Sequence, residues 1–163
     1  MLIRKAELKD LKELTDIYNF EVLNGVATFD LEPKTLEERK VWFDNHSSSR
    51  HPLIVAEIEG CVAGYASLST YREKEAYKST AELSVYIGDK FRGQGVATKL
   101  MERILEMARE EQSLHTVVSV ITAGNEVSAY LHKKFGFEYC GTMAEVGMKF
   151  GRYLGIENYR ISV

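Results

Sequence analysis

The chain has 163 residues, of which 45% are hydrophobic and 28% charged, with a net charge of −3 at pH 7. This length and composition predict a single domain, residues 1–163, large enough to bury a substantial core. The weakly acidic balance offers no basic surface for nucleic acid, and no apolar run reaches the roughly 20 residues that span a bilayer. Because the N-terminus is charged and lacks an apolar stretch, we expect no signal peptide and a cytoplasmic location.

The first half of the chain predicts two helices and then a β-hairpin. Thr35 and Glu38 have the spacing of a capping box, which predicts the start of the second helix. The turn at Glu59-Gly60 separates two apolar runs and predicts the hairpin. The expected elements are a strand at 2–6, a helix opened by Asp10 as N-cap and ended by Asn24-Gly25, a loop at 25–33, a helix through Val41, Trp42 and Phe43, a loop at 46–52, and strands at 53–58 and 61–68.

The second half alternates strands and helices. Six apolar residues between Ala97 and Ala108 recur at helical spacing, so we expect a helix with one buried face there. The other expected elements are strands at 81–87, 115–122, 137–149 and 153–162, and a helix from about Asn125 to Phe135 closed by Gly136. Hairpins at both ends and alternation in the middle predict an α/β domain of mixed α+β type, with a mixed sheet and helices on both faces.

The cysteines and histidines give no sign of a disulfide or a metal site. Neither Cys61 nor Cys140 belongs to a CxxC motif, and the four histidines show no metal-binding spacing. We therefore expect two reduced thiols and no metal.

A glycine-containing turn, Phe91-Arg92-Gly93-Gln94-Gly95, lies between the strand at 81–87 and the long helix. A helix start offers unpaired N–H groups and a partial positive charge, and glycines allow close approach to the backbone. A phosphate-bearing ligand is the functional interpretation, and a plain strand-to-helix turn is the alternative. The P-loop lysine and hydroxyl are absent, and Thr98 stands where the dinucleotide-binding fingerprint has its third glycine.

Two blocks of sequence resemble the GNAT acyltransferase superfamily. The segment 92–97 has the pattern [QR]xxGx[GA], which resembles the loop that holds the pyrophosphate of acetyl-CoA in that family, and residues 121–142 resemble its next block. The segments TFDLEP, YREKEAY, AELSVYI and GMKFGRYLGI resemble the branch of phosphinothricin and methionine sulfone or sulfoximine N-acetyltransferases. The resemblance implies a largely antiparallel sheet of about seven strands, a homodimer, and acetyl transfer from acetyl-CoA to the α-amine of a small amino-acid-like substrate.

The resemblance also implies which residues hold acetyl-CoA. One amide of the strand 85–87 is expected to stabilise the oxyanion, and for this reason Tyr86 is also counted among the catalytic residues. Asn125 is equally suited to be a helix N-cap, and both roles can hold. The implied cofactor residues are Val85, Tyr86, Ile87, Arg92, Gly93, Gln94, Gly95, Val96, Ala97, Thr98 and Asn125.

Glu82 is the candidate general base. The attacking amine must lose a proton at neutral pH, and strand alternation places Glu82, Ser84 and Tyr86 on one face of an apolar strand. Desolvation there is expected to raise the carboxyl pKa, and the resemblance supports the same residue as the base. The alternatives are a glutamate on an edge strand facing water, or one paired with a lysine.

Each of the other candidate residues has two interpretations. His132 occupies the position where many superfamily members carry a tyrosine acid, and it is either catalytic or a packed helix residue. Arg72, Lys74 and Tyr77 belong to a polar segment that is either a substrate site or a solvated loop. Lys74 replaces an arginine common in the branch, and Lys cannot form a bidentate contact with an oxyanion.

Four points stay open from the sequence. Thr28 and Phe29 are weaker pocket candidates, and Phe29 is equally suited to the core. Gly155 stands where the branch usually carries an aspartate, a difference that bears on the choice of substrate and not on the type of reaction. The C-terminal aromatic residues fit a dimer interface or ordinary sheet packing. The alternatives in function are acetylation of protein lysines or N-termini, and a CoA-binding sensor without turnover.

Overall fold

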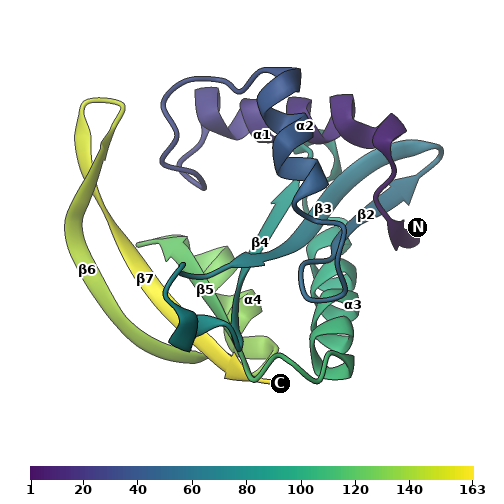
Figure 1. Cartoon of the computed structure of the whole chain (residues 1–163). Helices are drawn as coiled ribbons and strands as arrows, with labels where there is room; N and C mark the ends of the chain where they lie inside the picture. The colour runs from purple at the N-terminus through teal and green to yellow at the C-terminus, as the bar shows by residue number, and fades with distance from the viewer.

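The computed structural model describes all 163 residues and contains seven strands and four α-helices (Figure 1). The strands are β1 Leu2–Lys5, β2 Leu53–Ile58, β3 Cys61–Thr70, β4 Thr80–Ile87, β5 Thr116–Thr122, β6 Glu138–Lys149 and β7 Arg152–Ser162. The helices are α1 Leu11–Asn24, α2 Leu36–Asp44, α3 Val96–Glu110 and α4 Glu126–Lys134. Every predicted helix and strand is present, with boundaries that differ by a few residues at most. No helix is both long and apolar enough to cross a membrane.

One sheet runs through the whole chain in the order β1-β2-β3-β4-β5-β7-β6. All neighbouring strands are antiparallel except β4 and β5, which confirms the predicted mixed, largely antiparallel sheet. The parallel pairing of β4 with β5 covers only Thr80–Glu82 and Thr116–Val118, after which the two strands separate. The sheet is therefore open at its centre along the second half of β4.

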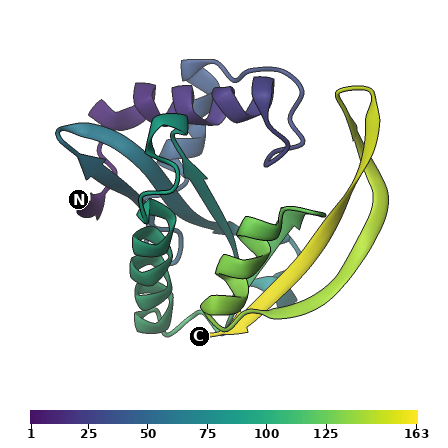
Figure 2. The ribbon, with the colours of Figure 1, turned by 180° about the vertical axis from the view of Figure 1, so that it is seen from behind.

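Helices cover both faces of the sheet, with α3 and α4 on one face and α1 and α2 on the other (Figures 1 and 2). The larger core joins the buried stripe of α3 to Ala81 and Leu83 of β4, whereas Tyr86 packs against the smaller core under α1. This arrangement confirms the predicted alternation. Glu82 and Ser84 therefore share the face of β4 that α1 and α2 cover.

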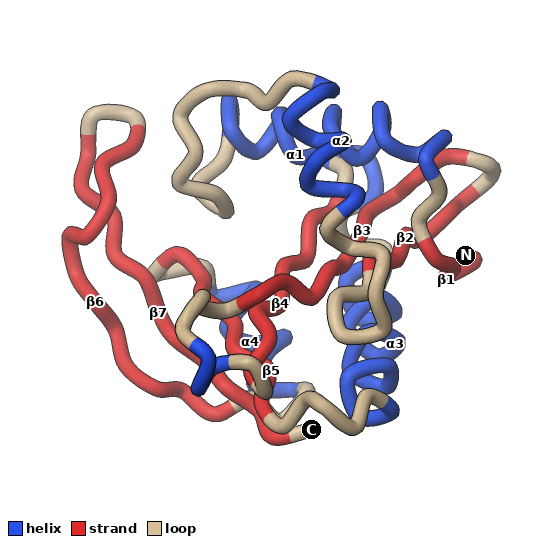
Figure 3. The backbone as a smooth tube through the Cα atoms, viewed as in Figure 1, coloured by secondary structure: helices blue, strands red, loops and turns tan.

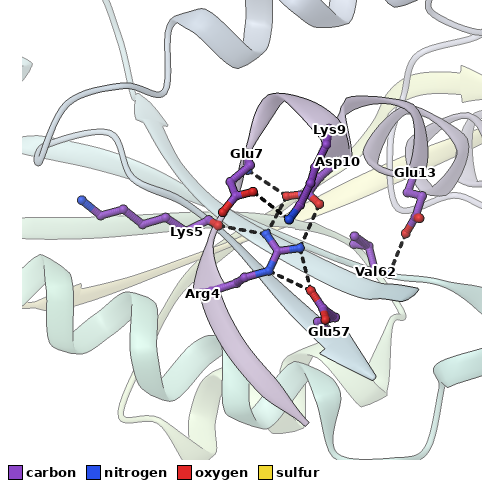
Figure 4. A network of polar contacts seen from close by, with 8 residues as sticks. All are labelled: Arg4, Lys5, Glu7, Lys9, Asp10, Glu13, Glu57 and Val62. Carbon is purple, nitrogen blue, oxygen red and sulfur yellow. Dashed lines mark hydrogen bonds and ion pairs between the residues drawn. The ribbon is translucent and has the colours of Figure 1, made fainter. Parts of the chain in front are cut away.

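A polar network fixes the start of α1 to the edge of the sheet (Figure 4). Arg4 of β1 donates to Asp10 (2.7 Å) and pairs with Glu57 of β2 (2.7 Å). Burial pushes the pKa of Asp10 up, but the hydrogen bonds from Arg4 and from the Glu7 amide outweigh it and leave that pKa below its usual value. The helix does begin after Asp10, but the Asp10 side chain caps no amide of α1, because Arg4 and Glu7 occupy it.

The predicted capping box at α2 is confirmed. Val41 is 63% exposed, and the buried position of this helix belongs to Arg39 instead. Gly25 ends α1 with an extended φ of −121°, and its missing side chain leaves room for the Glu21 carboxylate. Both cysteines are free thiols, as expected, and both are exposed.

The loop between α1 and α2 reaches across to the β6–β7 hairpin (Figure 3). The Lys149 ammonium of β6 is buried and donates to the carbonyls of Thr28 (2.8 Å) and Glu21 (3.3 Å). Phe29 lies so close to Gly147 that a Cβ there would meet its ring at 2.5 Å. These contacts hold the loop over the face of the sheet that carries Glu82.

Candidate active site

The glycine turn after β4 presents a row of free backbone amides. Gly93 and Gly95 have φ of +73° and +78°, which other residues adopt only with strain, and a Cβ at either position would face open space. The Lys99 amide donates to the Gly95 carbonyl (3.2 Å), whereas no amide from Gly93 to Thr98 donates to any group of the chain. Six consecutive N–H groups at the start of a 15-residue helix fit a diphosphate.

Two side chains of this turn are engaged within the protein. The Arg92 guanidinium pairs with Glu21 of α1 and lies 3.6 Å from Asp89, while half of its side chain stays exposed. Gln94 donates to the Lys90 carbonyl (3.0 Å). The free backbone amides of this turn are therefore better placed to bind an anion than the side chains of Arg92 and Gln94.

The open edge of β4 adds backbone groups beside this turn. Gly88 donates its amide to the Ala63 carbonyl of β3 (2.9 Å). Since backbone groups point to alternate sides along a strand, the Tyr86 amide also faces β3, and those of Val85 and Ile87 face the opening. Two of the three predicted amides, those of Val85 and Ile87, therefore face the opening between β4 and β5 and can pair with an extended ligand, whereas the Tyr86 amide, turned to β3, cannot be the oxyanion donor.

Glu82 lies at the point where the opening begins. Its strand is central in the sheet, and its cross-strand neighbour is Ser69. The carboxylate is half-buried and has neither an ion pair nor a hydrogen bond in the chain, so the edge-strand and lysine-pair alternatives are both wrong. Desolvation raises the carboxyl pKa, as predicted, toward the range of a general base.

A cavity of about 250 Å³ opens on the same face of the sheet, under α1 and α2. Burial raises the pKa of Tyr18 to about 12 and that of Tyr86 well above its usual value, so both phenols stay protonated at neutral pH. The lining residues are Tyr18, Asp30, Lys34, Arg39, Trp42, Tyr65, Ser67, Ser84 and Tyr86.

Arg39 is the lining residue that sequence reasoning missed. It is only 5% exposed, and its guanidinium lies 3.6 Å from the centroid of the Trp42 ring. The available signal was its position three residues before Trp42, which places both side chains on one face of the helix.

The predicted substrate residues occupy other places. Thr28 is buried with its hydroxyl 2.9 Å from that of Tyr18, and Phe29 packs against β6, so neither lines the cavity. Arg72 is exposed and lies 5.0 Å and 5.5 Å from the ring centroids of Tyr71 and Tyr77. Lys74 is exposed in the same segment, which joins Thr70 to Thr80 just before Glu82.

Asn125 and His132 lie along α4. The Asn125 side chain accepts from the Ser128 amide (3.1 Å), so the N-cap interpretation is confirmed. The His132 Nδ1 donates to the Ser128 carbonyl (2.7 Å), and its Nε2 is buried without a partner. Desolvation lowers the pKa of His132, so the ring is neutral at pH 7, which favours the packed residue over the acid.

Comparisons with known proteins agree with this geometry. The model of the "Acetyltransferase (GNAT) domain" family matches residues 3–155. A methionine sulfoximine/methionine sulfone acetyltransferase of Pseudomonas aeruginosa is 41% identical over 155 residues, which cover 94% of this chain and 90% of the relative.

Two solved structures have almost the same fold. The first is a ribosomal-protein-alanine N-acetyltransferase from Brucella melitensis, 40% identical, with a TM-score of 0.96 over 100% of both chains. The second is a phosphinothricin acetyltransferase from Sinorhizobium meliloti in complex with AcCoA, 32% identical, with a TM-score of 0.95 over 99% of this chain and 88% of the other. The free amides, the open strand edge and these similarities together show that the chain belongs to the GNAT acetyltransferase family.

Proposed function

We propose that this protein transfers the acetyl group of acetyl-CoA to the α-amine of a small amino acid of the phosphinothricin or methionine sulfoximine type. The observation that carries the proposal is the position of Glu82, an unpaired carboxylate of raised pKa where β4 and β5 separate. The class of substrate is supported by the names of two relatives, the methionine sulfoximine/methionine sulfone acetyltransferase of Pseudomonas aeruginosa, 41% identical, and a phosphinothricin N-acetyltransferase of Streptomyces coelicolor, 40% identical over 160 residues. A cavity of about 250 Å³ suits a small molecule.

In this proposal backbone amides orient acetyl-CoA, and Glu82 accepts a proton from the substrate ammonium. Bound acetyl-CoA supplies an acetyl group that is already activated as a thioester, so the proposal invokes no metal. The amides of Gly93–Thr98 hold the diphosphate, and one of the Val85 and Ile87 amides donates to the carbonyl oxygen as negative charge develops there. Glu82, directly or through a water, accepts the proton that the substrate ammonium must lose before its nitrogen attacks. The C–N bond then forms and the C–S bond of the thioester breaks, so that CoA leaves as a thiolate, which a thiol pKa of about 8.5 makes a tolerable leaving group.

A substrate panel tests the proposal. Acetyl-CoA turnover is measured with phosphinothricin, methionine sulfoximine, methionine sulfone and unmodified amino acids, and with peptides that begin with alanine. We expect acetylation of at least one of the three analogues at millimolar concentration and none of the peptides. Turnover of the peptides alone would show that the protein is a protein acetyltransferase, as the similarity to the Brucella melitensis enzyme suggests. Binding of acetyl-CoA without any turnover would show a sensor.

We also propose that residues 1–163 act as one domain, in the cytoplasm, as a homodimer. The dimer is supported by the edge strand β6, its partner β7 and the turn between them, where five large hydrophobic side chains are exposed by more than half: Tyr139, Met143, Met148, Phe150 and Tyr153. By contrast, Tyr159 is buried in the sheet and is ordinary packing. We expect sedimentation of protein from a cytoplasmic fraction to give one species of twice the 18.5 kDa chain mass. A species of 18.5 kDa alone would contradict the dimer.

A further inference from the structure

Arg39 is a buried cation without a counter-ion. Its side chain is 5% exposed and forms no ion pair in the chain. Nη2 donates to the Tyr65 hydroxyl (3.2 Å), whereas Nε is buried and has no partner. Burying a charge without a partner is costly, so this guanidinium fits an anionic or oxo group of a ligand.

Aromatic rings of the cavity hold the guanidinium in place, but no carboxylate pairs with it. The rings of Trp42 and Tyr18 lie 3.6 Å and 4.5 Å from the guanidinium carbon, and such stacking orients its hydrogen-bonding edge. The one carboxylate of the cavity, Asp30, accepts from Tyr18 (2.5 Å) and lies 3.7 Å from Lys34. Arg39 is therefore the free positive charge of this cavity.

The distance from Glu82 determines which part of a substrate Arg39 can meet. Ser84, which lines the cavity, is two residues from Glu82 on the same strand, roughly 7 Å away. Tyr65, the partner of Arg39, lies opposite Tyr86, roughly 13 Å along β4 from Glu82. A carboxylate bonded to the same carbon as the amine stays near Glu82, whereas the end of a side chain extends toward Arg39.

We propose that the cavity around Arg39 binds the polar end of the substrate side chain. It selects amino acids whose side chain ends in a phosphinate, sulfone, sulfoximine or carboxylate, with Ser67 and Ser84 as further hydrogen-bonding groups. This inference rests on the proposed function, since it names the cavity that binds the side-chain end of the substrate whose amine Glu82 deprotonates.

The test compares two substrates in Arg39→Gln and Arg39→Lys. Phosphinothricin carries an anionic side-chain end, and methionine has an apolar side chain of similar length. We expect kcat/KM for phosphinothricin to fall about 10- to 150-fold, the factor that corresponds to one hydrogen-bonded charge. For methionine we expect a change of about threefold or less, because its side chain makes no such contact.

Matched measurements separate binding from folding. Lys40→Gln removes a neighbouring cation of α2 that pairs with Asp44, and it should leave the ratio of the two kcat/KM values unchanged. Calorimetry should give wild-type affinity for acetyl-CoA in every variant. If Arg39→Gln fails to fold, Tyr65→Phe, which removes the partner hydroxyl, should shift the same ratio several-fold.

An equal loss for both substrates in the Arg39 variants would overturn the inference, because it would show a structural role alone. An unchanged ratio would also overturn it. A wild-type enzyme that binds acetyl-CoA but acetylates none of the three analogues would instead contradict the proposed function.

Discussion

We expect the replacement of Glu82 by Gln to lower kcat/KM for the amine substrate by about 10²- to 10⁴-fold, the range of a general base. The acid limb of the pH profile also changes. Only ionised Glu82 accepts a proton, so wild-type activity falls as the pH drops through its pKa, which burial raises above the ordinary 4.5. Because the glutamine amide does not titrate, the variant keeps only the dependence that arises from the amine. Initial rates across a pH series measure both effects.

The stability of Glu82→Gln distinguishes this loss from misfolding. A carboxyl whose pKa is raised by folding favours the folded state below its unfolded pKa and loses that contribution as the pH rises through the folded pKa. At neutral pH the ionised side chain therefore opposes folding, and we expect no fall in melting temperature. Glu110→Gln, at the exposed end of α3, is the control that keeps full activity. Unchanged kcat/KM in Glu82→Gln would show that this carboxylate is not the base.

We expect the replacement of Gly95 by Val to raise the dissociation constant of acetyl-CoA by tenfold or more. The new side chain stands in the open space before the free amides, and the φ of +78° strains any residue with a Cβ. The loss of one charge-assisted hydrogen bond, about 1.5 to 3 kcal/mol, is enough for this factor. Isothermal calorimetry with acetyl-CoA measures it directly.

Gly60→Val is the matched control for this prediction. Gly60 has a φ of +80° in the β2–β3 turn and, like Gly95, has no atom within 4 Å of a Cβ position. Both variants carry a similar backbone strain, so both should lose a similar amount of stability, but only Gly95→Val should lose affinity. Equal affinities in the two variants would mean that the amides of this turn do not hold the cofactor.

The helices, the strands and the choice of Glu82 as candidate base could be predicted because each depends on a short-range pattern in the sequence. The capping box of Thr35 and Glu38, the apolar stripe of α3 and the alternation of β4 each depend on residues close together in sequence. The positive φ values of Gly93 and Gly95 follow in the same way from the turn itself.

The remaining features depend on distant contacts and could not be predicted in this way. The separation of β4 from β5 after Glu82 is a property of the assembled sheet, and it decides that Val85 and Ile87 face the opening. The burial of Arg39 arises because its guanidinium lies between the Trp42 ring of the same helix and Tyr65 of β3, against which α2 packs. The spacing of three residues places Arg39 and Trp42 on one face of α2, but the sequence of the helix does not show that this face is the one that packs on the sheet.

The central claim is that backbone amides at the end of β4 and the start of α3 hold acetyl-CoA with its acetyl group near Glu82. The most direct measurement is a titration of ¹⁵N-labelled protein with acetyl-CoA, followed by amide chemical shifts. The account predicts that the largest shifts occur at Gly93–Thr98, Val85 and Ile87, while Gly60 stays unchanged. The account would be contradicted if acetyl-CoA bound but left the chemical shifts of those amides unchanged and altered the shifts of amides on a different surface.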